Sequence, residues 1–526
     1  MIPSPRGSLR VKQRRRKEKD MKLNYKRTIL VGFAFFLISA FWQAYDAIVP
    51  LILTNHFGLS QTLSGVVMSI DNVLAVFMLP IFGALSDKIM TKHGKRTPFI
   101  FIGTIVAVVA FIVLSLVSSV QIQEISEAGI VSEYNEAYQE YEETVKSLEK
   151  QLEEKIINKD QRDAAKNEAS AKLTSIIPGL VERATNITLK NVWPLVAFIA
   201  VLLIVLIAMA TFRSPAVALM PDVTIKPLRS KANAIINLMG TAGGIIVLLI
   251  TKIWSLNKNL YTPFTIIIIP TCIVMIIGLV IFLTTVKEKK WADEMEEESN
   301  RHGLEAVENN EGKRSLGKDE MKSLLLILAS VALWYIGYNS ITSKYSDYST
   351  NVLGVDYGLT LIVAQAAAIV SYIPVGIVAS KIGRRKTILA GITMLATAFF
   401  IGNFINPGAD PLVMYPIFAL AGIGWATINV NSFPMVVELA KGGEVGKYTG
   451  YYYTASMAAQ IVAPILSGAL YDLFNMFTNG NGMRCVFFAF GTVFVALSFV
   501  TMFFVKHGDA KAEKVDALEA LGGADD

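Results

Sequence analysis

Cysteine, histidine and charge are scarce in this chain of 526 residues. It holds only two cysteines, Cys272 and Cys485, and four histidines. Two cysteines give no disulfide framework and no metal cluster, and no HExxH-type pattern includes any of the histidines. Both cysteines lie in or near long apolar runs, so we expect them to pack as small apolar side chains.

Charged residues make up only 17% of the chain, whereas hydrophobic residues make up 53%. A soluble domain averages about 25% charged residues, so most of this chain is expected to be solvated by something other than water. A phosphate-binding loop is also missing, because the nearest string, Gly442 to Tyr448, has the wrong glycine spacing and ends in tyrosine. We expect no enzymatic activity and no cofactor; any transport must be driven by an ion gradient or by the substrate's own gradient.

Long apolar runs fill most of the remaining sequence. A helix needs roughly 20 apolar residues to cross the hydrocarbon core, and these runs lack the alternation of outer-membrane strands. The first run follows a basic segment, but it is too long for a signal peptide and has no small-residue cleavage pattern. The sequence therefore predicts an all-α polytopic membrane protein with about twelve spans. The spans are expected at 28–53, 62–86, 98–120, 193–217, 232–251, 263–286, 323–343, 357–380, 387–406, 411–435, 449–474 and 485–505.

Six spans precede and six follow a polar, charged segment, which predicts two bundles joined by a linker. The expected parts are a basic N-terminus (1–27), a first bundle (28–286) with an insertion (121–192), a linker (287–322), a second bundle (323–505) and a tail (506–526). The insertion carries 14 acidic and nine basic residues in helix-forming sequence. We expect either a solvated helical hairpin or a cap that binds a partner or captures substrate.

Positive charge is distributed unequally between the two sides of the predicted membrane protein. If both termini lie on one side, segments on that side carry 35 Lys and Arg, and short segments on the other side carry four. Basic residues remain cytoplasmic, so we expect both termini in the cytoplasm of a cell bearing this protein in its plasma or inner membrane. The basic run from Lys12 to Asp20 needs only anionic lipid as a partner, and we expect no nucleic acid.

One junction between spans occurs twice. The first copy, GALSDKIMTKHGKRTPFI, runs from Gly83 to Ile100, and the shorter copy, GIVASKIGRRKTILAG, runs from Gly376 to Gly391. Small residues permit close helix approach, and an aspartate at the end of one helix can accept hydrogen bonds from the next helix N-terminus. The basic pair is expected to anchor the following helix to lipid headgroups and to pair with acidic loop residues. The second copy has Ser380 where an aspartate is expected, so it lacks that carboxylate for a charged latch.

These contacts are either ordinary loop chemistry or a latch that holds one conformation and breaks in another. We favour the latch. Its expected residues are Gly83, Asp87, Lys95, Arg96, Arg384, Arg385 and Glu438.

The first junction resembles the signature between helices two and three of the major facilitator superfamily. Longer segments resemble its sugar–cation symporters. Phe41 to Gly65 is similar to the start of sucrose–proton symporters, and Phe212 to Ile235 and Asn431 to Tyr453 resemble those proteins and the glycoside–pentoside–hexuronide symporters. The resemblance implies two six-helix bundles around a midplane site and sugar–cation symport by alternating access. It does not identify the sugar.

Two aspartates inside predicted spans are candidates for ion coupling. Intramembrane charge costs roughly 2.5–3.5 kcal/mol on insertion scales, so such residues are functional candidates. Asp46 and Asp71 lie roughly 10–14 Å below the outer surface, at 1.5 Å per residue, and can face each other. A partly desolvated carboxylate pair can bind and release a proton near neutrality, although sodium remains an alternative.

Sugar sites combine aromatic platforms with amides that bind hydroxyl groups. Polar and aromatic residues repeat on helical faces of the predicted spans, and Arg213 is the only Lys or Arg placed inside one. The resemblance implies a functional arginine near Arg213, and snorkelling to the interface is its structural alternative. The expected substrate-binding residues are Gln43, Arg213, Trp334, Tyr338, Asn339, Trp425, Asn429 and Gln460. Two other functions remain open: efflux or facilitated transport of another solute, and sensing through the insertion.

Overall fold

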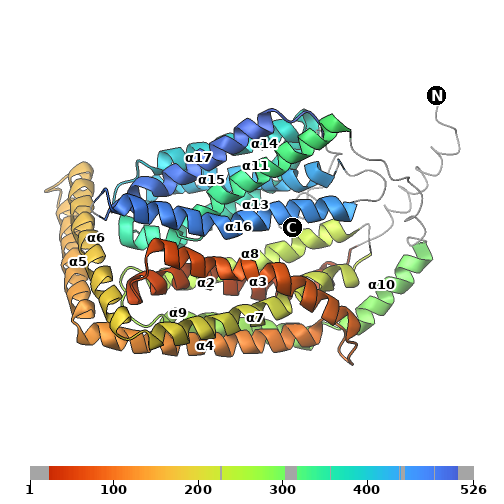
Figure 1. The fold of residues 1–526 in the computed structure, drawn as a ribbon, viewed down its shortest axis with the longest axis horizontal. Coiled ribbons are helices and arrows are strands. Elements are labelled where there is room, and N and C mark those ends of the chain that lie inside the picture. Colours follow the sequence, from red (N-terminus) through yellow and green to blue (C-terminus); the bar gives the residue numbers. More distant parts are fainter. Residues whose placement is uncertain are drawn as a thin grey trace.

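The computed structural model describes residues 23–225, 228–302, 317–355, 357–437, 439, 445–478 and 480–507. Within these residues the chain forms two helical bundles that lie side by side (Figure 1). The first bundle contains α2 (Tyr25–Leu51), α3 (Gln61–Lys88), α4 (Thr97–Glu127), α7 (Trp193–Asp222), α8 (Arg229–Ile253) and α9 (Thr265–Thr285). The second contains α11 (Lys318–Thr342), α13 (Tyr357–Ile382), α14 (Arg384–Gly402), α15 (Pro411–Val437), α16 (Val445–Asn475) and α17 (Gly482–Phe503).

Shorter and polar helices complete the described chain. The π-helix η1 (Ile52–His56) continues α2, and α12 (Tyr345–Asp347) and η3 (Tyr348–Leu353) follow α11. The insertion forms a hairpin of α5 (Ile130–Glu153) and α6 (Lys159–Lys190), and α10 (Glu288–His302) follows the first bundle. Figure 1 shows the hairpin across one end of both bundles, here called the insertion end, and α10 at the opposite end, here called the linker end.

The fold class predicted from the sequence is confirmed. Eleven described helices are long and apolar enough to cross a membrane, and α13 contributes a shorter apolar stretch, Tyr357–Tyr372. Each of the twelve predicted spans corresponds to one of these helices. The largest boundary difference is at α4, which continues to Glu127 and carries the chain into the insertion without a break.

Helix starts follow their capping residues. The side chain of Asn24 accepts a hydrogen bond from the Arg27 N–H at the start of α2, and Ser60 does the same for the Leu63 N–H of α3. Asn158 forms a capping box with Gln161 at the start of α6. These side chains satisfy N–H groups that have no partner within the first helical turn.

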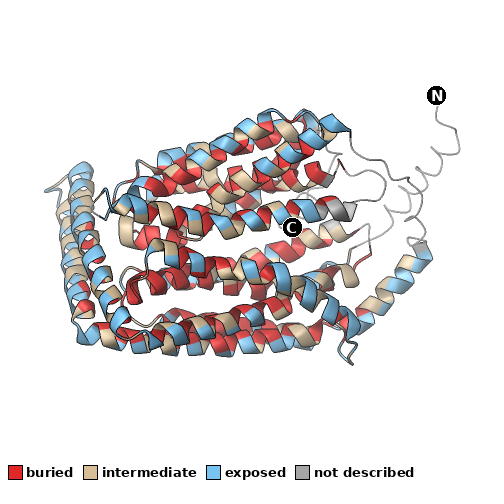
Figure 2. Ribbon diagram, viewed as in Figure 1, coloured by how far each residue is buried: buried red, intermediate tan, exposed pale blue. Residues whose placement is uncertain are grey.

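The bundles meet most closely where α3 packs against α16. Helices in lipid associate through close packing of small residues rather than through a hydrophobic driving force. A Cβ atom at Gly65 of α3 would lie 2.1 Å from the Pro464 carbonyl oxygen, and one at Gly468 of α16 would lie 2.3 Å from the Gln61 carbonyl oxygen. The two backbones therefore touch near the insertion end. Towards the linker end, α3 exposes Phe77 and Ile81, and the red buried positions thin out along it in Figure 2.

The predicted linker is partly structured. Its first half forms α10, a polar helix in which Lys290 and Glu294 are 3.8 Å apart and Arg301 donates to Glu297 at 3.3 Å. Trp291 is buried, with the Arg27 guanidinium 5.3 Å from its ring centroid. Apolar periodicity could not reveal this helix because Trp291 is the one apolar residue of α10 that is buried.

Candidate functional site

A polar contact crosses between the bundles in the insertion half of the helices. Gln43 of α2 donates from Nε2 to the Tyr357 hydroxyl at 2.9 Å and accepts at Oε1 from Gln365 Nε2 at 3.0 Å. Tyr357 and Gln365 both belong to α13 of the second bundle. The structure therefore places Gln43, a predicted substrate residue, on the surface where the two bundles face each other.

Neither Gln365 nor Tyr357 is among the residues predicted from the sequence. A usable signal was present for Gln365, because it is the one amide within an otherwise apolar run in the first half of α13. Tyr357 stands at the helix start, where a tyrosine is usually an interfacial anchor. Only the folded structure brings its hydroxyl to Gln43.

The ionisable residues predicted within spans gather beside this contact. Asp46 and Asp71 are half-buried and close enough to interact electrostatically, and Asp71 also interacts with Arg213. The guanidinium of Arg213 lies 5.8 Å from the Trp42 ring centroid. Arg213 is thus directed towards α2 and α3 rather than towards the end of its own helix. An acid pair with one cation nearby is an arrangement whose charge can change during a transport cycle.

The predicted aromatic residues divide into two groups. Tyr338 stacks on Trp425, with ring centroids 5.8 Å apart and an interplanar angle of 26°. Trp334 is only 1% exposed and packs against Tyr335, with ring centroids 4.0 Å apart. The Tyr338–Trp425 pair is the better candidate for a platform because both side chains are only half-buried.

The predicted amides of the second bundle have different surroundings. Asn339 donates from Nδ2 to the Tyr335 carbonyl of its own helix at 2.8 Å. Asn429 is buried, and Gln460 of α16 is half-buried. In the described part of the chain, neither Asn339 nor Gln460 makes a hydrogen bond with Gln43 like that of Gln365.

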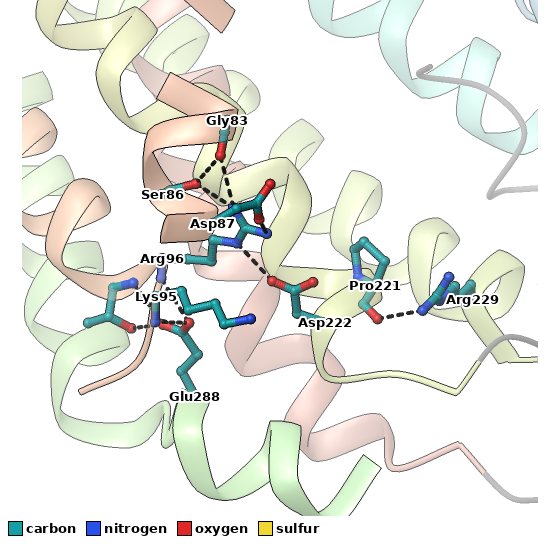
Figure 3. A network of polar contacts seen from close by, with 10 residues as sticks. Gly83, Ser86, Asp87, Lys95, Arg96, Pro221, Asp222, Arg229 and Glu288 are labelled. Carbon is teal, nitrogen blue, oxygen red and sulfur yellow. Dashed lines mark hydrogen bonds and ion pairs between the residues drawn. The ribbon is translucent and has the colours of Figure 1, made fainter. Parts of the chain in front are cut away.

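The first junction is organised around the Arg96 side chain (Figure 3). Its Nη2 lies 2.5 Å from Asp87 Oδ1, and its Nε donates to Asp222 Oδ2 at 2.7 Å. The Nη1 group donates to the Ser86 hydroxyl and, at 3.5 Å, to the Gly83 carbonyl. Arg96 therefore joins the ends of α3 and α7 to the start of α4.

Arg96 is buried, so the expectation that it anchors α4 to lipid headgroups is wrong. Burial lowers the pKa of its guanidinium, but the hydrogen bonds and charges of Asp222 and Asp87 outweigh that effect, and the pKa is raised overall. The group stays protonated because both carboxylates stabilise its charged form.

Glu288, the first residue of α10, caps the same junction. Its Oε1 accepts from the backbone N–H groups of Lys95 (2.6 Å) and Arg96 (2.8 Å). Its Oε2 accepts from the N–H and the hydroxyl of Thr97, both at 2.7 Å. A carboxylate at a helix N-terminus is favoured by the helix dipole and by these charge-assisted bonds. Lys95 thus contributes its backbone N–H to the junction, through the hydrogen bond to Glu288.

Sequence reasoning missed Glu288, because a glutamate within a charged linker gives no signal of its own. Gly94 indicates why the position is tight: it has φ +119°, and a Cβ there would lie 2.2 Å from the Glu288 carboxyl carbon. That backbone region is essentially open to glycine alone.

The second junction uses its basic residues differently. Arg385 donates from Nε to the Met502 carbonyl at 3.4 Å and from Nη2 to the Phe503 carbonyl, and its guanidinium lies 5.8 Å from the Phe503 ring centroid. Arg384 is half-buried at the start of α14. Glu438, also expected in the latch, lies outside the described residues.

Comparison with known proteins identifies the family. The model of the Major Facilitator Superfamily matches residues 4–126, 175–371 and 349–522. The chain belongs to this superfamily. Its members are secondary transporters of small solutes and not enzymes, and the twelve helices and the junction at Gly83 have the positions that the resemblance implied.

Curated relatives in the superfamily match only short segments. A putative glycoside/cation symporter YagG of Escherichia coli (strain K12) is 34% identical over 64 residues, which cover 12% of this chain and 14% of that protein. An MFS-type transporter ppzB of Metarhizium rileyi (strain RCEF 4871) is 28% identical over 107 residues, which cover 20% of this chain and 21% of that protein. The matches thus span about a fifth or less of these relatives.

Solved structures share the fold at low sequence identity. A D-xylose-proton symporter matches with a TM-score of 0.53 and 15% identity, over 93% of this chain and 99% of that one. A bacterial homologue of the iron transporter ferroportin in an inward-facing state matches with a TM-score of 0.59 and 11% identity, over 92% and 99%. Proteins with such different named cargoes share this architecture, so the fold alone does not select a substrate.

Proposed function

We propose that this major facilitator protein transports a small sugar together with a cation, with a proton as the first candidate and sodium as the second. Alternating access of the two bundles moves both. The partial match to a glycoside/cation symporter supports the sugar class. The sequence segments that resemble sugar–cation symporters support it as well.

The contact between Gln43 and Gln365 is the observation that carries this proposal. It places amides of both bundles at one point, beside Asp46, where a solute can bind to the two bundles at once. Amides suit sugar hydroxyls because each offers both a donor and an acceptor. The Tyr338–Trp425 pair supplies an aromatic face, and Trp42 with Arg213 supplies a second one.

In the proposed cycle, Asp46 and Asp71 take up the coupling ion and Arg213 balances their charge. Binding of a cation removes the repulsion between two carboxylates in a poorly solvated site, and its release restores that repulsion. The ion therefore acts mainly in the first bundle, whereas the sugar contacts both. We also propose that the linker end faces the cytoplasm and the insertion end faces outside, in a plasma or inner membrane.

The test is counterflow and uptake in proteoliposomes, with a panel of mono- and disaccharides and with imposed pH or sodium gradients. Asp46→Asn and Asp71→Asn are expected to abolish uphill accumulation while sparing sugar exchange. Asp319→Asn, an exposed residue in the first turn of α11, is the matched control. If no sugar moves under any gradient, the sugar assignment fails, and efflux or facilitated transport of another solute takes its place. Accumulation retained by both mutants removes the two aspartates from the mechanism.

A further inference from the structure

Helix α6 of the insertion is fixed to the first bundle at its C-terminal part. Thr185 donates from its hydroxyl to the Gly58 carbonyl at 2.6 Å, in the turn between η1 and α3. Thr188, three residues later, accepts from Gln121 Nε2 of α4 at 2.9 Å. Both threonines lie on one face of α6, so this part of the helix moves with the first bundle.

The preceding part of α6 is seated against the second bundle. Ser170 is fully buried and donates to the Leu353 carbonyl at 3.3 Å. It fits a notch between Gly354 and Gly408, where a Cβ would lie 2.5 Å from the Ser170 hydroxyl oxygen and 2.7 Å from its Cβ, respectively. The notch is itself fixed, because the Gly408 N–H donates to the Leu353 carbonyl at 2.6 Å.

Two further contacts extend this seat along α6. Arg162, near the helix start, pairs with Asp163 of its own helix at 2.6 Å and also lies 4.0 Å from Asp410, and the side chains of Arg162 and Asp410 are largely shielded from solvent. Pro178 lies 3.7 Å from the Cβ position of Gly480, in the turn between α16 and α17. The helix thus contacts three separate loops of the second bundle while its other part is fixed to the first.

Near α6, polar side chains, among them the buried Lys344, join the two bundles directly. Asp472 of α16 accepts from the N–H groups of Gln61 (2.9 Å) and Thr62 (2.7 Å), so it caps the N-terminus of α3. Lys344 donates to Ser64 of α3 at 2.6 Å and to Gln61 Oε1 at 3.0 Å. Opening this end breaks the Asp472 cap of α3 and the hydrogen bonds from the buried Lys344 ammonium to α3, so these contacts favour closure of this end.

We propose that the α5–α6 insertion is a clasp that holds the insertion end closed and shifts the conformational equilibrium towards the state that opens at the linker end. Opening at the insertion end separates the bundles, and that movement must withdraw Ser170 from its notch. The clasp therefore adds its contact free energy to that of these polar contacts between the bundles. The inference rests on alternating access and not on the identity of the sugar.

The test measures distances between spin labels in the full chain in lipid nanodiscs, with Cys272 and Cys485 replaced by serine. One label pair, at Leu63 and Leu473, reports separation at the insertion end, and a second, at Leu85 and Tyr451, reports the linker end. All four positions are exposed and lie on α3 or α16. No substrate is needed, so a failure of the sugar assignment leaves this measurement intact.

Ser170→Trp cannot enter the notch. We expect it to raise the population with long insertion-end distances about threefold and to shorten the linker-end distances. Ser175→Trp, at an exposed position on the same helix, is the matched control and should resemble the parent. Unchanged distributions in Ser170→Trp would overturn the proposal.

A charge exchange tests the same proposal independently, in case the tryptophan variant misfolds locally. Arg162→Glu replaces the cation between Asp163 and Asp410 by a carboxylate and should shift the distances in the same direction by a smaller amount. Arg162→Glu combined with Asp410→Arg restores opposite charges and should return the distributions to those of the parent. If the double variant is as open as the single one, or if neither differs from the parent, the Arg162 contact has no part in the clasp and the proposal fails.

Discussion

The two helix junctions have similar sequences but bind their basic residues to different partners. Arg96 of the first junction lies between the carboxylates of Asp87 and Asp222, whereas Arg385 of the second contacts backbone carbonyls at the end of α17. Cations favour a helix C-terminus because of its exposed carbonyls and its dipole. A repeated basic turn therefore fixes neither the partner nor the strength of the contact.

The contact with Glu288 is a second feature that distinguishes the first junction. The first junction receives a carboxylate from the segment that leads towards the other bundle. The junction thereby ties α3, α4, α7 and the start of α10 into one unit.

The largest expected effect comes from removing the arginine at each junction. Arg96→Ala leaves two carboxylates facing each other without their shared cation, and we expect uptake to fall about tenfold. Arg385→Ala removes hydrogen bonds to carbonyls that water can partly replace, so uptake should fall about twofold. Initial rates in proteoliposomes, corrected for the amount of folded protein, measure both. Equal losses in the two variants would mean that the junctions are equivalent despite their different partners.

Removing the carboxylate cap is expected to have the next largest effect. Glu288→Ala deletes four acceptor contacts at the start of α4 and should destabilise the protein by about 1–3 kcal/mol. Glu297→Ala is the matched control, because Glu297 lies on the same helix with its side chain 70% exposed. Thermal unfolding in detergent should show a lower Tm for the first variant only. A similar Tm for both variants would mean that the cap contributes little.

The sequence predicted the long helices and two of the charged residues of the first junction. Twelve apolar runs gave the twelve long helices, because lipid demands continuous apolar length, and the Gly83 junction gave Asp87 and Arg96 together. Asp222 and Glu288 were not predicted. Each is far from Arg96 in the chain, and a single carboxylate after an apolar run resembles any other residue of a polar loop.

At the candidate transport site, too, the sequence identifies single residues but not their distant partners. Asp46, Asp71 and Arg213 could be selected because charge within a span is rare. Gln365 and Tyr357 could not be paired with Gln43 from the sequence, since about three hundred residues separate them and their contact depends on how the bundles close. Charged residues within apolar spans can be identified from the sequence, whereas their partners across the interface between the bundles cannot.

A smaller effect is expected from filling the glycine turns. Gly94 (φ +119°) and Gly383 (φ +93°) precede the helix in each junction, so alanine should strain both by about 1–2 kcal/mol. Gly94→Ala also collides with the Glu288 carboxylate and should lower the Tm more. The extra loss should vanish when Glu288 is already alanine, which a double-mutant cycle measures. If Gly94→Ala still lowers the Tm more than Gly383→Ala when Glu288 is alanine, the extra strain lies in the Gly94 backbone and not in the collision with Glu288.

The smallest effect should separate the two carboxylates that share Arg96. The Asp222 side chain is 34% exposed and that of Asp87 is 62% exposed, so solvent screens the Asp87 pair more strongly. Asp87→Asn should therefore change the free energy of unfolding by only about 0–1 kcal/mol, whereas Asp222→Asn should cost more. Raising the salt concentration should change the difference in unfolding free energy between the two variants only slightly, because the guanidinium itself is buried. Chemical unfolding at low and high salt provides the measurement. A larger loss for Asp87→Asn than for Asp222→Asn would show that the end of α3, rather than the end of α7, holds Arg96 in place.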